Sequence, residues 1–367
     1  FRRTVEFKKH SMENLEMNSS FWNNKRVLIT GHTGFKGSWL TIWLKKLGAE
    51  VIGFSNSVPT NPSLYELSGI NSDIISVTGD IRDLQTVQNT FLQYKPQIVI
   101  HMAAQSLVGP SYDDPVETYS TNVMGTVNLF ESIRKSNGTS VIINVTSDKC
   151  YENKETLNGY VETDKLGGYD PYSNSKACSE LVTSSFRNSF FKDHPDGKNL
   201  ASVRAGNIIG GGDWSDNRLV PDIMKSLQQE LSLKIRNPDG IRPWQHVLDP
   251  LHGYLTLAEH LWDNGSKFSE AWNFGPDQNS VKPVSWIIDQ ISEYWGSPIN
   301  WKKSEQDFHE THVLSLNCSK SKSELNWNPK LNLIDSIKWT VDWFKEFYNK
   351  SDMRKITEKQ INDFTLL

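Results

Sequence analysis

The chain has 367 residues, of which 37% are hydrophobic and 22% charged, and its formal net charge is −4. This length suffices for two domains, and the weakly negative charge gives no indication of a nucleic acid or an anionic membrane as a partner. The small number of cysteines, 3, and apolar runs far too short for a bilayer exclude disulfide-rich and membrane-spanning classes and favour a reducing, cytoplasmic location.

The first segment of the chain is polar and carries no apolar stretch that could act as a signal peptide. Met12 or Met17 is a more natural start than Phe1. We therefore expect residues 1–20 to be a leader or a disordered segment and leave them out of the fold prediction.

Short apolar runs alternate with helical segments from residue 25 onward. The pattern predicts strands at 26–30, 51–54, 74–77, 98–100 and 141–145, and helices at 39–47, 116–135 and 172–191. Strands that are apolar throughout and separated by helices are typical of a parallel sheet covered on both faces. We therefore predict an α/β fold in which residues 21–205 form a Rossmann-type, doubly wound parallel sheet.

The pattern changes after residue 205. Residues 206–220 are rich in Gly, Asp and Asn, and residues 237–244 form a polar turn region with two prolines. Such segments are typical of loops that carry ligand-binding side chains. We expect residues 206–348 to form mainly a smaller C-terminal substrate-binding domain, with crossings back to the sheet, and the charge-rich residues 349–367 to form a peripheral tail.

Three glycines follow the first predicted strand and precede a helix. In this context Gly31 permits a tight turn, Gly34 lets the backbone approach a pyrophosphate, and Gly37 lets helix and strand pack closely. The helix N-terminus supplies N–H donors and a positive dipole for the phosphates. We expect a dinucleotide cofactor at this motif, bound by Gly31, Thr33, Gly34, Phe35, Lys36 and Gly37.

The end of the second strand does not distinguish NAD from NADP. Residues 54–57 offer neither an acidic residue for the ribose hydroxyls nor an arginine for a 2′-phosphate. Asp80 and Ile81, after the third strand, are candidates for bracketing the adenine, with an ordinary turn as the alternative.

Two groups of polar residues indicate acid–base chemistry. Tyr172 and Lys176 are four residues apart, so on a helix the ammonium can lie beside the phenol and lower its pKa, which suits proton removal from a sugar hydroxyl. Ser147, Asp148 and Lys149 directly follow the fifth predicted strand. Ligands bind beyond the carboxyl ends of parallel strands, so we expect these three side chains to face a substrate.

Together, the G-x-x-G-x-x-G at 31–37, the hydroxyl residue after the fifth strand and the Tyr-x-x-x-Lys resemble the extended short-chain dehydrogenase/reductase family that acts on nucleotide sugars. Segments 31–39, 146–151, 167–173 and 242–247 are similar to its 4,6-dehydratases of the CDP-sugar branch, whose signature is Asp148-Lys149. The likeness runs from about residue 21 to about residue 347.

The resemblance implies a lyase with NAD as cofactor and CDP-glucose as substrate, working in deoxysugar synthesis for a bacterial surface polysaccharide. Tyr172, aided by Ser147 and Lys176, would remove the 4-hydroxyl proton as hydride passes from C4 to NAD. Lys149 would then take the C5 proton and Asp148 would protonate the departing C6 hydroxyl, before hydride returns to C6. The alternatives are an epimerase, a dehydratase for another nucleotide sugar, and a catalytically silent nucleotide-binding regulator.

The same resemblance implies cofactor contacts from Ala103 and Ala104, and substrate contacts from Gln105, Ser111, Asn207, Arg218, Arg242 and Trp244. Asn207 would bind a phosphate oxygen, Arg242 would pair with the pyrophosphate, with Arg218 as a second candidate, and Trp244 would pack near the base or ribose. One departure stands out, because these dehydratases typically have arginine where this chain has Gly109. The loss of that cation puts the activity or the sugar preference in question.

Members of this group commonly pair through two long helices, which correspond here to 116–135 and 172–191. The resemblance therefore implies a homodimer, with a tetramer as the alternative, and neither a nucleic acid nor a membrane as partner. His309 and Glu310, close to His312, could suggest a metal cluster. Since the family needs no metal, we expect none.

Overall fold

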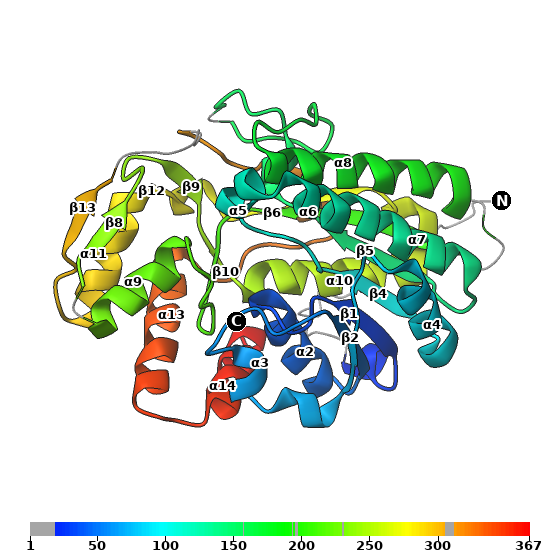
Figure 1. The fold of residues 1–367 in the computed structure, drawn as a ribbon, viewed down its shortest axis with the longest axis horizontal. Helices are drawn as coiled ribbons and strands as arrows, with labels where there is room; N and C mark the ends of the chain where they lie inside the picture. Colours follow the sequence, from blue (N-terminus) through cyan, green and yellow to red (C-terminus); the bar gives the residue numbers. More distant parts are fainter. Residues whose placement is uncertain (1–18, 157, 193, 195–196, 230, 305–311) are drawn as a thin grey trace, which may run out of the picture.

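The computed structural model describes residues 19–156, 158–192, 194, 197–229, 231–304 and 312–367. A seven-stranded parallel sheet with the order β11-β6-β5-β4-β1-β2-β3 runs through its centre (Figure 1). The strands are β1 (Arg26–Thr30), β2 (Glu50–Ser55), β3 (Ile75–Thr78), β4 (Ile98–His101), β5 (Val141–Val145), β6 (Asn199–Ala205) and β11 (Ala271–Phe274). The predicted Rossmann-type α/β fold is confirmed, and only β3, at the sheet edge, is displaced by one residue.

Helices cover both faces of this sheet. Val27 and Ile29 of β1 belong to the core shared with α2 and α10, whereas Leu28 belongs to the core shared with α4 and α7. In Figure 1, α8 and α10 lie on opposite sides of the sheet. This double covering explains why β4 (Ile98–His101) and β5 (Val141–Val145) are buried at every position. The helices are α2 (Phe35–Lys46), α4 (Leu84–Tyr94), α7 (Gly125–Lys135), α8 (Pro171–Phe186) with its continuation η4 (Arg187–Phe191), and α10 (Leu248–Asn264).

The helix predicted at 116–135 is interrupted by a π-helical turn. It consists of α6 (Pro115–Tyr119), η2 (Ser120–Met124) and α7. Within η2, the buried Asn122 accepts a hydrogen bond from the Gln105 N–H and donates one to Ser175 Oγ, both 2.9 Å long. The π turn therefore ties this helix to the loop after β4 and to α8, and such turns are frequent near functional sites.

Residues 206–348 form short strands and helices at one end of the sheet, and β11 returns to the main sheet beside β6. In Figure 1, α9, β8, β13 and α11 stand together on the left. These elements are β7 (Ile208–Ile209), α9 (Leu219–Gln229), β8 (Leu233–Ile235), β9 (Ile241–Pro243), β10 (Gln245–His246), β12 (Val281–Pro283), α11 (Val284–Trp295), β13 (Trp301–Lys303), α12 (Ser319–Glu324) and α13 (Leu333–Tyr348). Short elements elsewhere are α1 (Ser19–Trp22), α3 (Leu64–Leu67), η1 (Ile70–Asp73), α5 (Val108–Asp113), η3 (Asp148–Cys150), η5 (Gly265–Phe268) and η6 (Gln278–Ser280).

The C-terminal segment is not the peripheral tail that its charge suggested. It forms α14 (Met353–Thr365), in which Ile361 and Phe364 are completely buried. The ring of Phe364 makes an edge contact with Trp43 of α2, with centroids 5.7 Å apart. The charged residues occupy the other face of an amphipathic helix, so composition alone concealed its apolar face.

No helix in the described part of the chain is long and apolar enough to cross a membrane. Residues 1–18, which include most of the expected leader, lie outside the described residues.

Candidate active site

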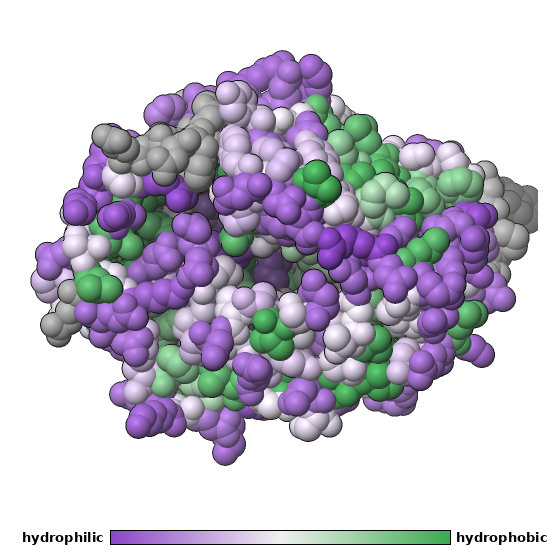
Figure 2. Space-filling model, in the orientation of Figure 1, coloured by the Kyte–Doolittle hydropathy of each residue, from purple (hydrophilic) through white to green (hydrophobic). Residues whose placement is uncertain are grey.

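A cavity of about 1170 Å³ opens between the carboxyl ends of the central strands and the segments at 206–222 and 233–244. Its mouth is visible near the middle of the face in Figure 2. The volume is large enough for more than one ligand of ordinary size. All the residues predicted for the cofactor and the substrate line this cavity except Ser111.

The turn between β1 and α2 has the geometry expected of a phosphate-binding motif. Gly31 has φ +76°, and a β-carbon there would lie 2.8 Å from the backbone nitrogen of Ala103. A β-carbon on Gly37 would lie 2.1 Å from the Gly31 carbonyl oxygen, so only glycine permits this approach of α2. On Gly34 the nearest protein atom would be 3.5 Å away. Gly34 therefore leaves its space to the cavity, which fits a diphosphate at the N-terminus of α2.

Asp80 and Ile81 also line the cavity. Asp80 accepts hydrogen bonds from the backbone N–H of Arg82, at 2.8 Å, and from its guanidinium, and these bonds lower the pKa of Asp80. Thr33 Oγ1 donates to the carbonyl of Ser57 at 2.7 Å. Both contacts brace the cavity wall.

Tyr172 and Lys176 share one face of α8 as predicted, but the expected lowering of the phenol pKa by Lys176 is not observed. Burial raises the pKa of Tyr172 to about 12, and the groups that pull it down are a hydrogen bond with Ser147 and the charge of Arg218. Lys176 Nζ donates instead to the Val145 carbonyl, 3.3 Å away. Burial lowers the pKa of Lys176 to about 8, so the ammonium is still mostly protonated at neutral pH.

The three residues after β5 form a short 3₁₀ turn with an unusual carboxyl group. Ser147 Oγ donates to Asp148 Oδ1 at 3.1 Å and accepts from the Lys149 N–H at 3.2 Å. Asp148 is 3% exposed, and its Oδ2 is buried without a hydrogen-bond partner. Burial raises its pKa, against the opposing influence of Lys149, Ser147 and Arg242. A buried carboxyl with a raised pKa and a free oxygen suits proton donation to a ligand.

Gly206 lies tightly packed beside this carboxyl group. A β-carbon at Gly206 would lie 3.1 Å from Asp148 Oδ2 and 2.6 Å from Pro243 Cγ. Glycine at 206 therefore lets the backbone after β6 and Pro243 pack closely against this carboxyl group.

A buried ion pair beneath the site escaped the sequence analysis. Arg204 of β6 binds both carboxylate oxygens of Glu180, with Nη2 and Oε2 2.8 Å apart. Burial alone would raise the pKa of Glu180, but Arg204 and the hydroxyls of Thr146 and Ser202 lower it. Tyr172, Lys176 and Glu180 follow one another at four-residue spacing. That helical repeat was the signal that could have identified Glu180.

Of the two substrate-binding residues predicted after β4, Gln105 lines the cavity and Ser111 does not. The Gln105 amide donates to the Leu107 carbonyl and to Thr118 Oγ1, at 3.0 and 2.9 Å, so it organises the loop. Ser111 is completely buried and donates to the Val108 carbonyl at 2.7 Å. The prediction for Ser111 is wrong because the first turn of α5 directs its hydroxyl into the helix.

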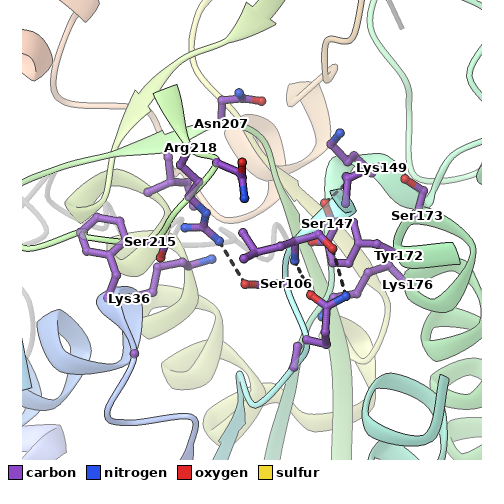
Figure 3. Close-up of a pocket in the computed structure, with 18 of the residues that line it drawn as sticks. Lys36, Ser106, Ser147, Lys149, Tyr172, Ser173, Lys176, Asn207, Ser215 and Arg218 are labelled. Atoms are coloured by element: carbon purple, nitrogen blue, oxygen red, sulfur yellow. Dashed lines mark hydrogen bonds between the residues drawn. The ribbon is translucent and has the colours of Figure 1, made fainter. Parts of the chain in front are cut away.

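Arg218 reaches across the cavity to this same loop. Its guanidinium donates to Ser106 Oγ at 3.1 Å and pairs with Asp213 at 3.2 Å. Arg218, Ser106 and Lys36 gather on one side of the site, and Ser147, Tyr172 and Lys176 on the other (Figure 3). The positively charged Arg218 thus contacts the loop that leads into α5, the helix in which Gly109 stands in place of the arginine of the family.

The remaining residues predicted to bind the substrate lie on the wall of the cavity that segments 206–222 and 233–244 form. Asn207 and Arg242 line the cavity, and Arg242 Nη1 donates to the carbonyls of Ile241 and His312 at 2.9 and 3.1 Å. Trp244 is 4% exposed and donates its indole N–H to the Lys282 carbonyl at 2.9 Å. Trp244 is therefore part of the core and of the cavity wall at once.

Among the described residues, no group of three or more His, Cys, Asp or Glu side chains could hold a metal ion. His309 and Glu310 lie outside the described residues.

Residues 28–340 match the family described as GDP-mannose 4,6 dehydratase. A CDP-glucose 4,6-dehydratase of Salmonella typhimurium is 49% identical over 352 residues, which cover 95% of this chain and 98% of that protein. The chain belongs to this dehydratase family. The resemblance to extended short-chain dehydrogenases/reductases of nucleotide sugars is thereby confirmed.

More distant members of the superfamily differ in activity. A UDP-glucose 4-epimerase of Halalkalibacterium halodurans is 26% identical, with 87% of this chain and 96% of that protein covered. The structure of UDP-glucose-4-epimerase from Stenotrophomonas maltophila, with bound NAD and formylated UDP-arabinopyranose, has a TM-score of 0.78 at 20% identity and covers 89% of this chain and 100% of that one. At 20% identity this structural similarity shows the fold only. The activity depends on the residues of the site.

Proposed function

We propose that this dehydratase converts CDP-glucose to CDP-4-keto-6-deoxy-glucose and water, with NAD as its cofactor. The carboxyl group of Asp148 carries the proposal, because it is buried, has a raised pKa and leaves one oxygen unpartnered in the cavity. Expulsion of a hydroxyl needs such an acid, whereas inversion at C4 does not. The nucleotide and the sugar are supported by the relative that is 49% identical.

The cofactor would be held by the turn at Gly31, Gly34 and Gly37, whose open space at Gly34 fits a diphosphate. Thr33, Phe35, Lys36, Asp80, Ile81, Ala103 and Ala104 would line its site, together with Tyr172 and Lys176. NAD, when bound, supplies the acceptor for the C4 hydride and returns that hydride to C6, so the reaction is redox-neutral.

The side chains supply the proton transfers. Tyr172, hydrogen-bonded to Ser147, takes the proton of the 4-hydroxyl as the C4 carbonyl forms. The phenol has to be ionised for this step, and the positive charge of a bound oxidised nicotinamide would favour its ionised form. That carbonyl acidifies C5–H, and Lys149 removes the C5 proton. Asp148 gives its proton to the C6 hydroxyl, which leaves as water. Protonation at C5 then completes the 4-keto-6-deoxy sugar.

The remaining assignments concern substrate binding. Arg218 and Arg242 pair with the diphosphate of the nucleotide sugar, and Asn207 binds one of its oxygens. Gln105 and Trp244 shape the walls, the first by organising its loop and the second by packing.

Incubation with CDP-glucose and NAD tests the proposal directly, with parallel reactions on UDP-, dTDP- and GDP-glucose. We expect loss of one water from the CDP-sugar, detected by mass spectrometry, without net reduction of NAD. The matched control is Tyr172→Phe, which keeps the ring but removes the proton acceptor and should slow turnover on the order of 10²–10⁴-fold. An epimer of CDP-glucose with unchanged mass would contradict the proposal.

We further propose that the protein is a homodimer that works in the cytoplasm. Val116, Met124 and Leu181 on α6, η2 and α8 are 76%, 52% and 58% exposed. Figure 2 shows an apolar area at its upper right, where Figure 1 draws α8. Val116 and Met124 also line an apolar groove of about 510 Å³. Burial of such a face against its own copy is favourable.

The unpaired Cys150, Cys178 and Cys318 support a reducing compartment.

Light scattering after size exclusion tests the dimer. We expect twice the mass of one chain for the unmodified protein and a single-chain mass for Leu181→Lys. A monomeric unmodified protein would contradict the dimer without affecting the proposed reaction.

A further inference from the structure

Asp222, in the first turn of α9, has a carboxylate that the proposed reaction does not use. It lines the catalytic cavity and is half-buried. It forms no hydrogen bond or ion pair with its side chain in the part of the chain that the structure describes, although nearby acids do. Asp213 pairs with Arg218, at 3.2 Å, and Asp216 pairs with Lys225.

An acidic residue in the first turn of a helix is favoured by the helix dipole, so its position alone does not indicate a ligand. A ligand is indicated instead by the lack of a hydrogen-bond or ion-pair partner for its side chain among the described residues. Burial raises the pKa of Asp222 to about 6, with Lys225 and Arg236 opposing this and Asp216 and Asp213 adding to it. The group is therefore mostly ionised at neutral pH while partly removed from water. Because the carboxylate has lost part of its hydration, a hydrogen-bond donor on a ligand in the cavity would stabilise it.

The place of Asp222 in the cavity indicates which part of a ligand it meets. If the proposed function holds, the sugar lies at Tyr172 and the diphosphate at Arg218, which directly precedes α9. Since α9 follows Arg218 in the chain and contacts β8, we place the base beyond Arg218, toward α9 and β8. Leu233 and Ile235 of β8 line the same end of the cavity and offer apolar surface to a flat ring.

We propose that the Asp222 carboxylate accepts a hydrogen bond from the exocyclic amine of the cytosine base and thereby selects cytidine over uridine and thymidine nucleotides. Aspartate and glutamate are the side chains that accept from cytosine N4. Uracil and thymine carry a carbonyl oxygen at the same ring position, which a carboxylate repels. The inference rests on the proposed function and assigns its base specificity to one residue.

The test compares binding of CDP and UDP to the full-length protein by calorimetry, in the unmodified chain and in Asp222→Asn. An amide of the same shape can turn either its oxygen or its NH₂ toward the base, so discrimination should relax. We expect the ratio of the two affinities to fall by about tenfold or more, which corresponds to the loss of one charged hydrogen bond. CDP should bind more weakly and UDP should bind no worse.

Asp216→Asn is the matched control, because it removes the same charge from a nearby side chain that is 83% exposed and paired with Lys225. It should leave the CDP-to-UDP ratio unchanged. Thermal unfolding and NAD affinity of both variants show whether the fold is retained, and Asp222→Ala provides a second variant if Asp222→Asn misfolds.

The inference is overturned if Asp222→Asn keeps the ratio within about twofold, if Asp216→Asn changes it equally, or if the unmodified protein does not prefer CDP. Turnover of CDP-glucose by the unmodified protein tests the proposed function separately. Turnover with an unchanged ratio would therefore refute the role of Asp222 alone.

Discussion

The ammonium of Lys36 donates a hydrogen bond to the hydroxyl of Tyr254, with Nζ and Oη 3.1 Å apart. This contact joins the glycine-rich turn to α10 at the floor of the cavity. Within the described residues Lys36 has no carboxylate partner. Burial, together with the charges of Lys176 and Arg218, lowers the pKa of Lys36 to about 7, while Asp148 opposes this. Its charge is therefore present below that pH and lost above it.

If Lys36 meets a diphosphate, as the glycine motif predicts, NAD should bind more weakly as the pH rises through about 7. Lys36→Met should weaken NAD binding by about tenfold at low pH and remove this part of the pH dependence. Fluorescence titration at several pH values measures both. Lys176, with a pKa of about 8, accounts for the dependence that remains. Tyr254→Phe keeps the charge and serves as control, and equal pH profiles for Lys36→Met and the unmodified protein would contradict the prediction.

Replacing Asp148 and replacing Lys149 should block different steps of the reaction. Lys149→Met removes the base for C5, so the C5 hydrogen of CDP-glucose should no longer exchange with D₂O. Asp148→Asn keeps that base but removes the acid for the C6 hydroxyl, so exchange should persist while product formation falls on the order of 10²–10⁴-fold. NMR of the recovered sugar distinguishes the two. Normal exchange in Lys149→Met would show that another group takes the C5 proton.

The glycine motif offers a matched pair of alanine substitutions. A β-carbon on Gly37 would lie 2.1 Å from the Gly31 carbonyl oxygen, so Gly37→Ala should lower the free energy of unfolding by about 1–3 kcal/mol and impair NAD binding as well. On Gly34 the β-carbon meets no protein atom within 3.5 Å and enters the cavity instead. Gly34→Ala should therefore leave stability nearly unchanged and weaken NAD binding alone. Urea unfolding and calorimetry measure the two effects, and equal destabilisation by both variants would contradict this account.

Asp249 should make the protein less stable as the pH rises toward neutral. It is completely buried, accepts a hydrogen bond from the Lys330 N–H at 2.7 Å, and burial raises its pKa to about 7. Between its unfolded pKa of about 4 and its folded pKa, the folded state keeps a proton that the unfolded state releases, so stability falls with increasing pH.

Asp249→Asn mimics the protonated form, so its stability relative to the unmodified protein should increase from about pH 4 to about pH 7. Buried His246 and His252, whose pKa values are lowered by burial, act in the opposite direction, but they are present in both proteins and cancel in the difference. Urea midpoints across this range provide the measurement, and a difference that is independent of pH would refute the role of Asp249.

Contiguous residues were sufficient to predict the central part of the fold and the first elements of the site. The strands β1 and β5 match their predicted bounds, because a strand covered on both faces consists mainly of apolar residues. The glycine turn and the Tyr172–Lys176 pair were predictable for the same kind of reason. Each depends on a few neighbouring residues whose spacing sets the backbone geometry.

Contacts between distant segments could not be predicted from neighbouring residues. Lys36 and Tyr254 are 218 residues apart, and Arg204 meets Glu180 only because β6 packs beneath α8. Ser111 was assigned to the cavity on the motif, yet a single helical turn directs its hydroxyl inward. Residues 349–367 were expected to form a peripheral tail, whereas α14 packs its apolar face against α2. Local spacing encodes strands, turns and helix faces, whereas burial, ion pairing and the pKa values of Asp148 and Asp222 arise only where layers of the folded chain enclose a side chain.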